Sequence, residues 1–283
     1  MKFGMHVSIA GSIDRAVDNA TNLKCTAFQM FTRNPREQAV KGLVSEEVKR
    51  FRAKLASSEI DKHAVCVHMP YFPNLSSTHE DIYKKSIDIL TEEMHRCGVL
   101  GVPYLVIHLG NHMGTGEEFG TRNLVHACNS TIESVKNDVV ILLENSAGTK
   151  NSIGSKFEDI RKILDQIEPR RRVGVCLDTC HAFAAGYELR TKKDVQGVID
   201  EFDKVVGLKE LKIVHLNDCR GDLNSRMDAH EHIGMGHIGE QGFTAILSNE
   251  VLKSIPFIME TPIDNRKDDN GNLKKCQELR NVH

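Results

Sequence analysis

The chain lacks several features that would assign it to a protein class at once. It has no apolar run long enough to cross a membrane, and its first residues, MKFGMH, contain no apolar signal core. Its eight cysteines are scattered without a Cys-x-x-Cys pair, which disfavours both a disulfide framework and a thiolate zinc site. We therefore expect free thiols and a cytoplasmic location.

The chain also lacks an excess of charge of either sign. It has 37 lysines and arginines against 39 aspartates and glutamates, so that the formal net charge is −2. A protein with this balance has no overall positive field to attract nucleic acid. Any anionic partner must therefore be held by local patches of charge or by metal ions.

Strand-like and helix-like stretches alternate along the whole chain. Short apolar segments predict strands at 2–9, 25–31, 63–69, 104–109, 139–144, 173–178, 211–217 and 256–260. Helical patterns lie between them, for example at 12–23, 45–57, 80–97, 118–136, 157–167 and 195–205. Eight such units with no low-complexity or linker-like segment predict a single domain over 1–283, an α/β fold of the TIM (β/α)8 barrel type. An open doubly wound sheet is the competing architecture.

The segment VGVCLDTCHAFAAG, at 173–186, combines a predicted buried strand with chemistry at its end. Asp178 and His181 follow the apolar run, and a carboxylate and an imidazole at the mouth of a strand can ligate one metal ion. The arrangement recurs, because a potential ligand closes six of the predicted strands: His68, His108, Glu144, Asp178, His215 and Glu260. All strands of a parallel barrel point the same way, so these residues would surround one opening at the C-terminal face of the strands.

Any one of these residues has an ordinary structural interpretation, because a histidine at a strand end is usually hydrogen-bonded or solvated. Six potential ligands, each at the end of a predicted strand, are much harder to obtain by chance. His181 adds a seventh, and the loop after the seventh strand adds Asp228 and His230, with His232 competing for the role of His230. Nine candidates exceed the ligands of one zinc ion, which predicts a cluster of two or three ions. The imidazoles favour zinc, manganese or iron over magnesium, and adjacent ions of this kind most often serve phosphodiester hydrolysis.

Five stretches resemble the signatures of the endonuclease IV family, the zinc-bearing apurinic/apyrimidinic-site DNA endonucleases built on a TIM barrel. They are GMHVSIAG at 4–11, LLENSAG at 142–148, CLDTCHAFAAG at 176–186, HLND at 215–218 and SRMDAHEHIG at 225–234. The similarity covers nearly the whole chain, and all nine candidate ligands fall where the family has its metal ligands. Ala229 departs from the pattern, since a basic residue is common there, and this departure weakens a phosphate contact and leaves metal binding intact.

The resemblance implies three zinc ions, one or more of them replaceable by manganese or iron. It assigns His68 and His108 to the first ion, Glu144 to a bridge between the first and second, Asp178, His215 and Glu260 to the second, and His181, Asp228 and His230 to the third. A hydroxide would attack the phosphorus 5′ to an abasic sugar and leave a 3′-hydroxyl and a 5′-deoxyribose phosphate. Glu144 and Glu260 would be the catalytic carboxylates, with Glu260 orienting the water.

The resemblance also implies a monomer that acts on double-stranded DNA containing abasic sites and that cleans blocked 3′ ends. Such enzymes bend DNA and flip the abasic sugar out of the stack, and side chains fill the gap. Arg36, Tyr71 and Phe72 match the inserting positions; taken alone they would be a solvated cation and a rim packed around prolines. Further candidates for phosphate contacts in predicted mouth loops are Arg33, Lys41, Arg220 and Arg226.

Two other classes of function compete with this interpretation. A sugar isomerase or epimerase of the xylose-isomerase-like barrels uses one metal, which Glu144, Asp178, His215 and Glu260 would hold while the glutamates shuttle a proton. It leaves the other five ligand candidates without a role, so metal stoichiometry discriminates between the two. A non-catalytic zinc or DNA-binding module is disfavoured by the near-neutral charge and by the open, water-accessible ring of candidate ligands.

A glycine-rich segment offers a third signal that we discount. Residues 234–239, GMGHIG, match the dinucleotide-binding pattern Gly-x-Gly-x-x-Gly. No predicted strand leads directly into them, as that pattern requires. We therefore interpret the segment as a flexible loop.

Overall fold

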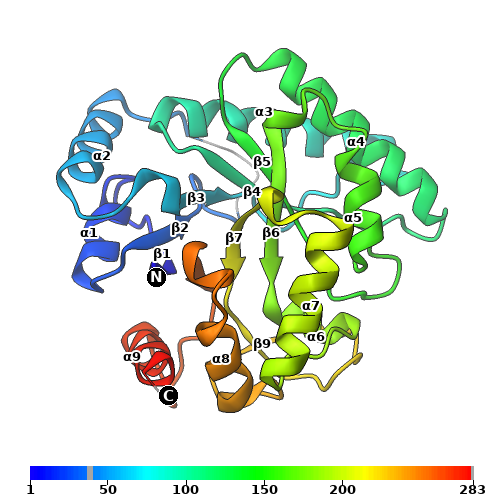
Figure 1. Ribbon diagram of the computed structural model, residues 1–283. Coiled ribbons are helices and arrows are strands. Elements are labelled where there is room, and N and C mark those ends of the chain that lie inside the picture. The colour runs from blue at the N-terminus through cyan, green and yellow to red at the C-terminus, as the bar shows by residue number, and fades with distance from the viewer. Residues whose placement is uncertain (37–40, 282–283) are drawn as a thin grey trace.

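Parallel strands close into a barrel in the computed structural model, which describes residues 1–36 and 41–281 (Figure 1). The barrel strands are β1 (Phe3–Val7), β2 (Ala27–Met30), β3 (Val65–His68), β4 (Tyr104–His108), β5 (Val140–Glu144), β6 (Val173–Asp178), β7 (Leu211–His215) and β10 (Phe257–Met259). Their order around the barrel is β1-β10-β7-β6-β5-β4-β3-β2, and each pairs with its neighbours in parallel. The predicted TIM barrel is confirmed, and the open doubly wound sheet is wrong.

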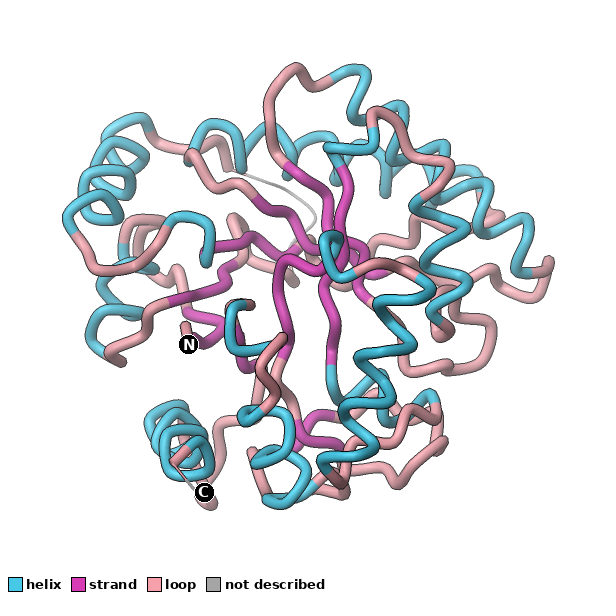
Figure 2. Tube along the Cα trace, in the orientation of Figure 1, coloured by secondary structure: helices cyan, strands magenta, loops and turns pink. Residues whose placement is uncertain are grey.

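Helices form an outer ring around these strands, as Figure 2 shows. They are α1 (Arg15–Asn22), α2 (Ser45–Ser57), α3 (Glu80–Leu100), α4 (Glu117–Ser134), α5 (Phe157–Leu164), α7 (Lys192–Val205), α8 (Gly239–Ser248) and α9 (Asp269–Arg280). The short helix α6 (Thr179–Ala185) instead continues directly from the C-terminal end of β6 (Figure 2). Short 3-10 turns at Lys62–Ala64, Arg170–Arg172, Leu208–Glu210 and Leu252–Ser254 lead into β3, β6, β7 and β10. Within the described segments, no helix combines the length and the apolar character that spanning a membrane requires.

The strands end sooner than the apolar patterns predict. The predicted strand 2–9 is paired only over Phe3–Val7, and the predicted strand 211–217 only over Leu211–His215. Burial continues past the last paired residue of β7, so the sequence pattern runs on after the hydrogen-bonded ladder has stopped. The helix α6 and a two-stranded hairpin of β8 (Asp218–Cys219) and β9 (His230–Glu231) were not predicted, because elements this short carry no periodic signal.

The apolar core has two compartments. A small cluster fills the inside of the barrel with residues such as Cys66, Leu142 and Ile258. A much larger cluster packs the outer faces of the strands against the helices. The strands are therefore buried on both faces, as their continuous apolar sequences indicate. All eight cysteines are buried free thiols.

A buried ionic network fastens the loop after β2 to α3. Glu93 on α3 is fully buried, and its carboxylate accepts hydrogen bonds from Thr32 Oγ1 (2.7 Å) and Arg33 Nε (2.6 Å). Arg96 donates from Nε to Thr32 Oγ1 at 2.6 Å. Burial raises the pKa of Glu93 even though Thr32 and the arginines oppose that rise. The prediction that Arg33 contacts phosphate is wrong, because its guanidinium lies in this network and pairs with Glu93 and Glu92.

We expect Glu93→Leu to lower the free energy of unfolding by about 3–5 kcal/mol, since it removes the fully buried counter-charge of two buried guanidinium groups and leaves them only the partly exposed Glu92. Urea denaturation followed by circular dichroism measures this loss. Glu92→Gln is the matched control, because Glu92 pairs with the same two arginines from a partly exposed position. The control should cost no more than about 1 kcal/mol. Equal small losses in both variants would contradict the assignment of the network as a structural anchor.

Candidate metal centre

The barrel gathers the predicted strand-end residues at one face. Five of them are the final residues of adjacent strands, namely His68 of β3, His108 of β4, Glu144 of β5, Asp178 of β6 and His215 of β7. Glu260 follows β10 directly. The register pairs His108 with Glu144 and Asp178 with His215 across neighbouring strands. The six side chains therefore start from one level at the C-terminal end of the barrel.

Glu144 lies at the centre of this face and is 1% exposed. Its Oε2 lies 3.1 Å from His68 Nε2 and 3.3 Å from His108 Nε2, whereas its Oε1 lies 3.1 Å from His215 Nδ1. Burial alone would raise the pKa of this carboxyl, but the imidazoles of His215 and His108 hold the pKa well below its usual range. Each oxygen of one ionised carboxylate thus faces a different set of imidazoles, which is the geometry of a bridging ligand.

A second group forms around His215, which is fully buried. Its Nδ1 lies 3.2 Å from Glu260 Oε2 and 3.8 Å from Asp178 Oδ2, in addition to the contact with Glu144. These four residues each offer a ligand atom, and the atoms lie within 4.8 Å of one another. One nitrogen and three carboxylates at this spacing suit a transition ion.

A third group consists of Asp178, His181 and His230, whose ligand atoms also lie within 4.8 Å of one another. His181 donates from Nδ1 to Asn145 O at 2.9 Å, and its Nε2 lies 3.0 Å from Asp228 Oδ1. His230 Nε2 is buried without a hydrogen-bond partner among the described residues, 3.6 Å from Asp178 Oδ2 and 4.0 Å from Asp228 Oδ1. A buried polar atom without a partner needs an explanation, and a cation between this nitrogen and the carboxylates provides one.

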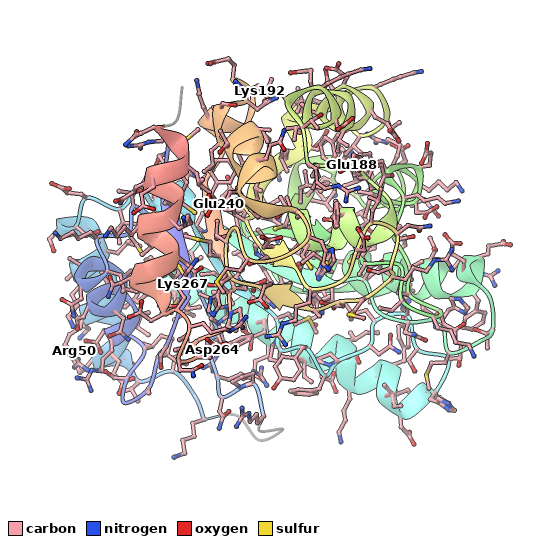
Figure 3. All side chains as sticks on the ribbon, turned by 90° about the horizontal axis from the view of Figure 1, so that it is seen from below. Arg50, Glu188, Lys192, Glu240, Asp264 and Lys267 are labelled. Atoms are coloured by element: carbon pink, nitrogen blue, oxygen red, sulfur yellow. The ribbon has the colours of Figure 1, made fainter. Side chains whose placement is uncertain are left out.

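The structure also separates His230 from its competitor. His232 is fully buried, and its Nε2 contacts Asp264 Oδ1 at 3.1 Å, while its Nδ1 contacts the amide of Asn272 at 3.0 Å. Figure 3 labels Asp264, which belongs to the loop between β10 and α9. His232 therefore fastens this loop and takes no part in the three groups.

Two asparagines position the ligands. Asn217 is fully buried, donates from Nδ2 to Asp178 Oδ2 at 2.7 Å and accepts from the backbone N–H of Glu260 at 2.8 Å. Asn145 accepts from the backbone N–H of Asp178 at 2.7 Å and donates to its carbonyl oxygen at 3.1 Å. Each stands within two residues of a predicted ligand, but an amide has no ligand signature in a sequence, so their role was not predicted.

The glycine-rich segment encloses a carboxylate. The backbone N–H groups of Gly234 and Gly236 donate to Asp218 Oδ2 at 3.0 and 2.9 Å, and that of Ile238 donates to Oδ1 at 3.0 Å. A Cβ atom at Gly236 would lie 2.6 Å from Asp218 Oδ1, so glycine is required for this close approach. The segment is therefore held by an internal anion, which explains the glycines without any bound dinucleotide.

An open cavity of about 260 Å³ connects the metal-ligand candidates with the rim of the barrel. Its lining includes Glu144, His108 and His181 at the inner end and Tyr71 and Phe72 at the outer end. Tyr71 is 56% exposed and Phe72 is 38% exposed. Apolar rings left in water at the edge of a polar cavity indicate a surface that receives a ligand.

The basic residues predicted to contact DNA differ in how exposed they are and in whether they form ion pairs. Arg36 and Arg226 are both exposed, in the loop after β2 and in the loop between β8 and β9, respectively. Lys41 is also exposed, whereas Arg220 lies with its Nε 3.5 Å from Glu231 Oε2. Together with the buried Arg33, these positions show that the cations around the mouth are partly committed to internal ion pairs.

Comparisons with known proteins agree with this geometry. Residues 17–281 match the family model described as xylose isomerase-like TIM barrel. A protein of Nitrosopumilus maritimus (strain SCM1) named "Probable endonuclease 4" is 52% identical over 279 residues, which cover 99% of this chain and 100% of that protein. The crystal structure of endonuclease IV from Thermus thermophilus gives a TM-score of 0.85 at 34% identity, covering 99% of this chain and 98% of that chain. A D-tagatose 3-epimerase-like protein gives a TM-score of 0.73 at 18% identity, covering 99% of this chain and 96% of that chain, and shows the same fold.

We expect the purified protein to carry more than one transition-metal ion per chain, because three groups of ligand atoms, which share only Glu144 and Asp178, converge at the barrel mouth. Inductively coupled plasma mass spectrometry measures the content. His230→Ala should lower it by one equivalent. His126→Ala, which removes an exposed histidine on α4, should leave it unchanged. A parent protein with a single ion would instead favour the one-metal centre of a sugar isomerase.

Proposed function

The chain belongs to the endonuclease IV family within the xylose isomerase-like TIM barrels, and on this premise we propose that it is a metal-dependent DNA-repair endonuclease. Its reaction is hydrolysis of the phosphodiester bond 5′ to an abasic site in double-stranded DNA. The products are a 3′-hydroxyl and a 5′-deoxyribose phosphate. The observation that carries the proposal is Glu144, whose two oxygens face separate sets of imidazoles, since a one-metal isomerase has no use for His68 and His108.

The ligand set fits three zinc ions, or manganese or iron in place of one or more of them, because it combines imidazoles and carboxylates without a thiolate. The three sets are His68, His108 and Glu144; Glu144, Asp178, His215 and Glu260; and Asp178, His181, Asp228 and His230. Such ions, when bound, activate water and stabilise the attacking and leaving oxygens of a phosphoryl displacement.

The carboxylates explain why this site needs cations before it can accept DNA. Glu144, Asp178 and Glu260 are crowded around His215, and a phosphodiester brought against three carboxylates alone would be repelled. Burial alone would raise the pKa of Glu260, but His215 holds the pKa well below its usual range, so this group is ionised at neutral pH. Glu260 would orient the attacking water. Glu144 would set the distance between the ligands on its two sides, because one oxygen faces His68 and His108 and the other faces His215.

The rim would recognise the lesion. Tyr71 and Phe72 stand at the outer end of the cavity that leads to Glu144. A sugar flipped out of the duplex would enter the cavity, and the two aromatic rings would occupy the gap that it leaves in the stack. Arg36, exposed in the loop after β2, would add a cation to the inserted group. A monomer suffices for this arrangement, because every proposed ligand and rim residue comes from one chain.

Removal of blocking groups from 3′ ends would use the same site. A blocking group at a 3′ end is also joined to the DNA through a phosphate ester. Its removal breaks the bond between the phosphorus and the 3′ oxygen, as cleavage 5′ to an abasic sugar does. The open cavity accepts a strand end as readily as a flipped sugar, since neither requires a base in the pocket. We therefore include 3′-diesterase activity in the proposed function.

We expect His68→Ala and His181→Ala each to slow nicking of a duplex with one abasic site by at least roughly 100-fold, the scale of losing one preorganised contact to developing charge. The thermal midpoint of each metal-free variant should stay near that of the metal-free parent chain, because neither side chain belongs to the apolar core. His95→Ala, an exposed histidine on α3, is the control. Full activity in both site variants would contradict the multi-metal mechanism.

We expect Tyr71→Ala to reduce the preference for abasic over intact duplex about tenfold, within the range of about 1–3 kcal/mol for one aromatic stacking contact. Competition binding with the two duplexes measures the preference, and single-turnover cleavage of bound substrate measures the chemistry. The cleavage rate should change less than the preference. An equal loss of affinity for both duplexes would argue against insertion of this ring.

A further inference from the structure

We propose that Gln29 is a positioning residue of the metal centre: it holds His215 in the tautomer that presents Nδ1 to the metal and holds Glu260 beside it, and so sets the metal affinity of that site. The inference deepens the proposed function and rests on its metal centre. It does not depend on which phosphodiester is cleaved.

Gln29 lies in the interior of the barrel. It belongs to β2 and is fully buried, and its Cα atom is paired with those of His6 on β1 and Cys66 on β3. A primary amide has two hydrogens to donate and an oxygen with two lone pairs. Burying such a group without partners costs free energy, so its contacts must account for its presence in an otherwise apolar strand.

Both the oxygen and the nitrogen of the amide have hydrogen-bond partners. The oxygen Oε1 lies 2.9 Å from His215 Nε2 and 3.2 Å from Cys66 Sγ. The nitrogen Nε2 lies 2.6 Å from Glu260 Oε1 and 2.9 Å from His6 Nδ1. One side chain therefore joins two metal-ligand candidates, His215 and Glu260, from the side that faces away from the cavity.

The chemistry of the partners fixes the orientation of the amide. The amide nitrogen of Gln29 donates to Glu260 Oε1, and its oxygen accepts from Cys66 Sγ, so the amide oxygen is the atom that faces His215. An oxygen can only accept, so Nε2 of His215 must carry the proton that it donates. The other ring nitrogen, Nδ1, lies 3.1 Å from Glu144 Oε1 and 3.2 Å from Glu260 Oε2, and its lone pair would be offered to a bound metal ion. Orientation of a ligand histidine through its second nitrogen is a general way of tuning a metal site.

His215 differs in this respect from three other histidines of the site. Backbone carbonyl oxygens accept from the Nδ1 atoms of His68 (Met69 O, 2.6 Å), His181 (Asn145 O, 2.9 Å) and His230 (Glu260 O, 3.2 Å). A backbone acceptor is present whatever the sequence. The tautomer of His215, in contrast, depends on a side chain that a single substitution can remove.

Two substitutions separate the roles of the amide. Gln29→Met keeps a similar volume and removes all four hydrogen bonds, so His215 loses the acceptor that fixes its tautomer. Gln29→Glu keeps an acceptor for His215 Nε2 but cannot donate to Glu260. In zinc-loaded protein labelled with ¹⁵N-histidine, we expect a proton on Nε2 of His215 that exchanges slowly with solvent in the parent and in Gln29→Glu, and loss of that protection in Gln29→Met. The signal is assigned by its absence from His215→Ala.

Metal affinity provides the second readout. Chelator competition against the zinc-loaded protein should show one equivalent bound about 10–100-fold more weakly in Gln29→Met, the usual cost of losing a partner of a ligand histidine. The remaining zinc should be unaffected. Asn137→Leu is the control, because it removes a satisfied amide next to the opposite, N-terminal end of β5. It should lower stability while leaving the protection of the His215 Nε2–H and the zinc affinity unchanged.

The outcomes are distinct. If Gln29→Met keeps the protected Nε2–H and the zinc affinity and loses stability only, as Asn137→Leu does, Gln29 is a packing residue and the proposal is overturned. If Nε2 of His215 carries no proton in the zinc-loaded parent protein, the proposal is overturned without any variant. If both effects appear but neither the parent nor the variants nick abasic DNA, the role of Gln29 is supported and the proposed substrate is wrong.

Discussion

The ionised carboxylate of Glu144 is the contact on which the rest of the site depends. It comes from β5, and its two oxygens meet imidazoles from β3, β4 and β7, so it joins both sides of the barrel mouth. A carboxylate can occupy a fully buried position only when neighbouring positive charge compensates for the lost hydration. The imidazoles provide part of that compensation, and metal ions would provide the remainder. The fold and the chemistry of this protein are therefore coupled at one residue.

The near-neutral chain reaches this arrangement by segregating its charges. Acidic side chains are gathered inside the mouth, where Asp178 and Glu260 accompany Glu144. Several cations near the rim are neutralised internally, most clearly Arg33, whose pairs with Glu92 and Glu93 hold the loop after β2 in place. In the proposed function, recognition of DNA would then depend on a few exposed groups and on the metal centre, since the chain has no overall positive field.

The sequence allowed the barrel and the positions of the strand-end ligands to be predicted, because barrel topology converts regular spacing along the chain into a ring in space. His68 and His215 are far apart in sequence, yet each had to lie at the same face once the strands were parallel.

What could not be predicted depends on contacts between distant segments. The choice of His230 over His232 is decided by Asp264 and Asn272, and the sharing of Asp178 between two groups is decided by Asn217. Gln29 stood unnoticed within an apolar strand, because its role exists only through four partners on three other strands and a strand-end loop.

The hairpin of β8 and β9 has a consequence for how the metal centre is assembled. Asp228 and His230 are carried by this hairpin and its loop, whereas the other proposed ligands come from barrel strands or the helix that directly follows β6. The base of the hairpin is fixed, since Asp218 is clasped by the backbone of the glycine-rich segment that leads into α8. The loop between Arg220 and Met227 lies against α6, because the backbone N–H groups of Asn224 and Arg226 donate to the carbonyl oxygens of Phe183 and Ala184. Two of the proposed ligands, Asp228 and His230, are thus carried by a segment outside the barrel, whereas the residues that they face, Asp178 and His181, are fixed by β6 and α6.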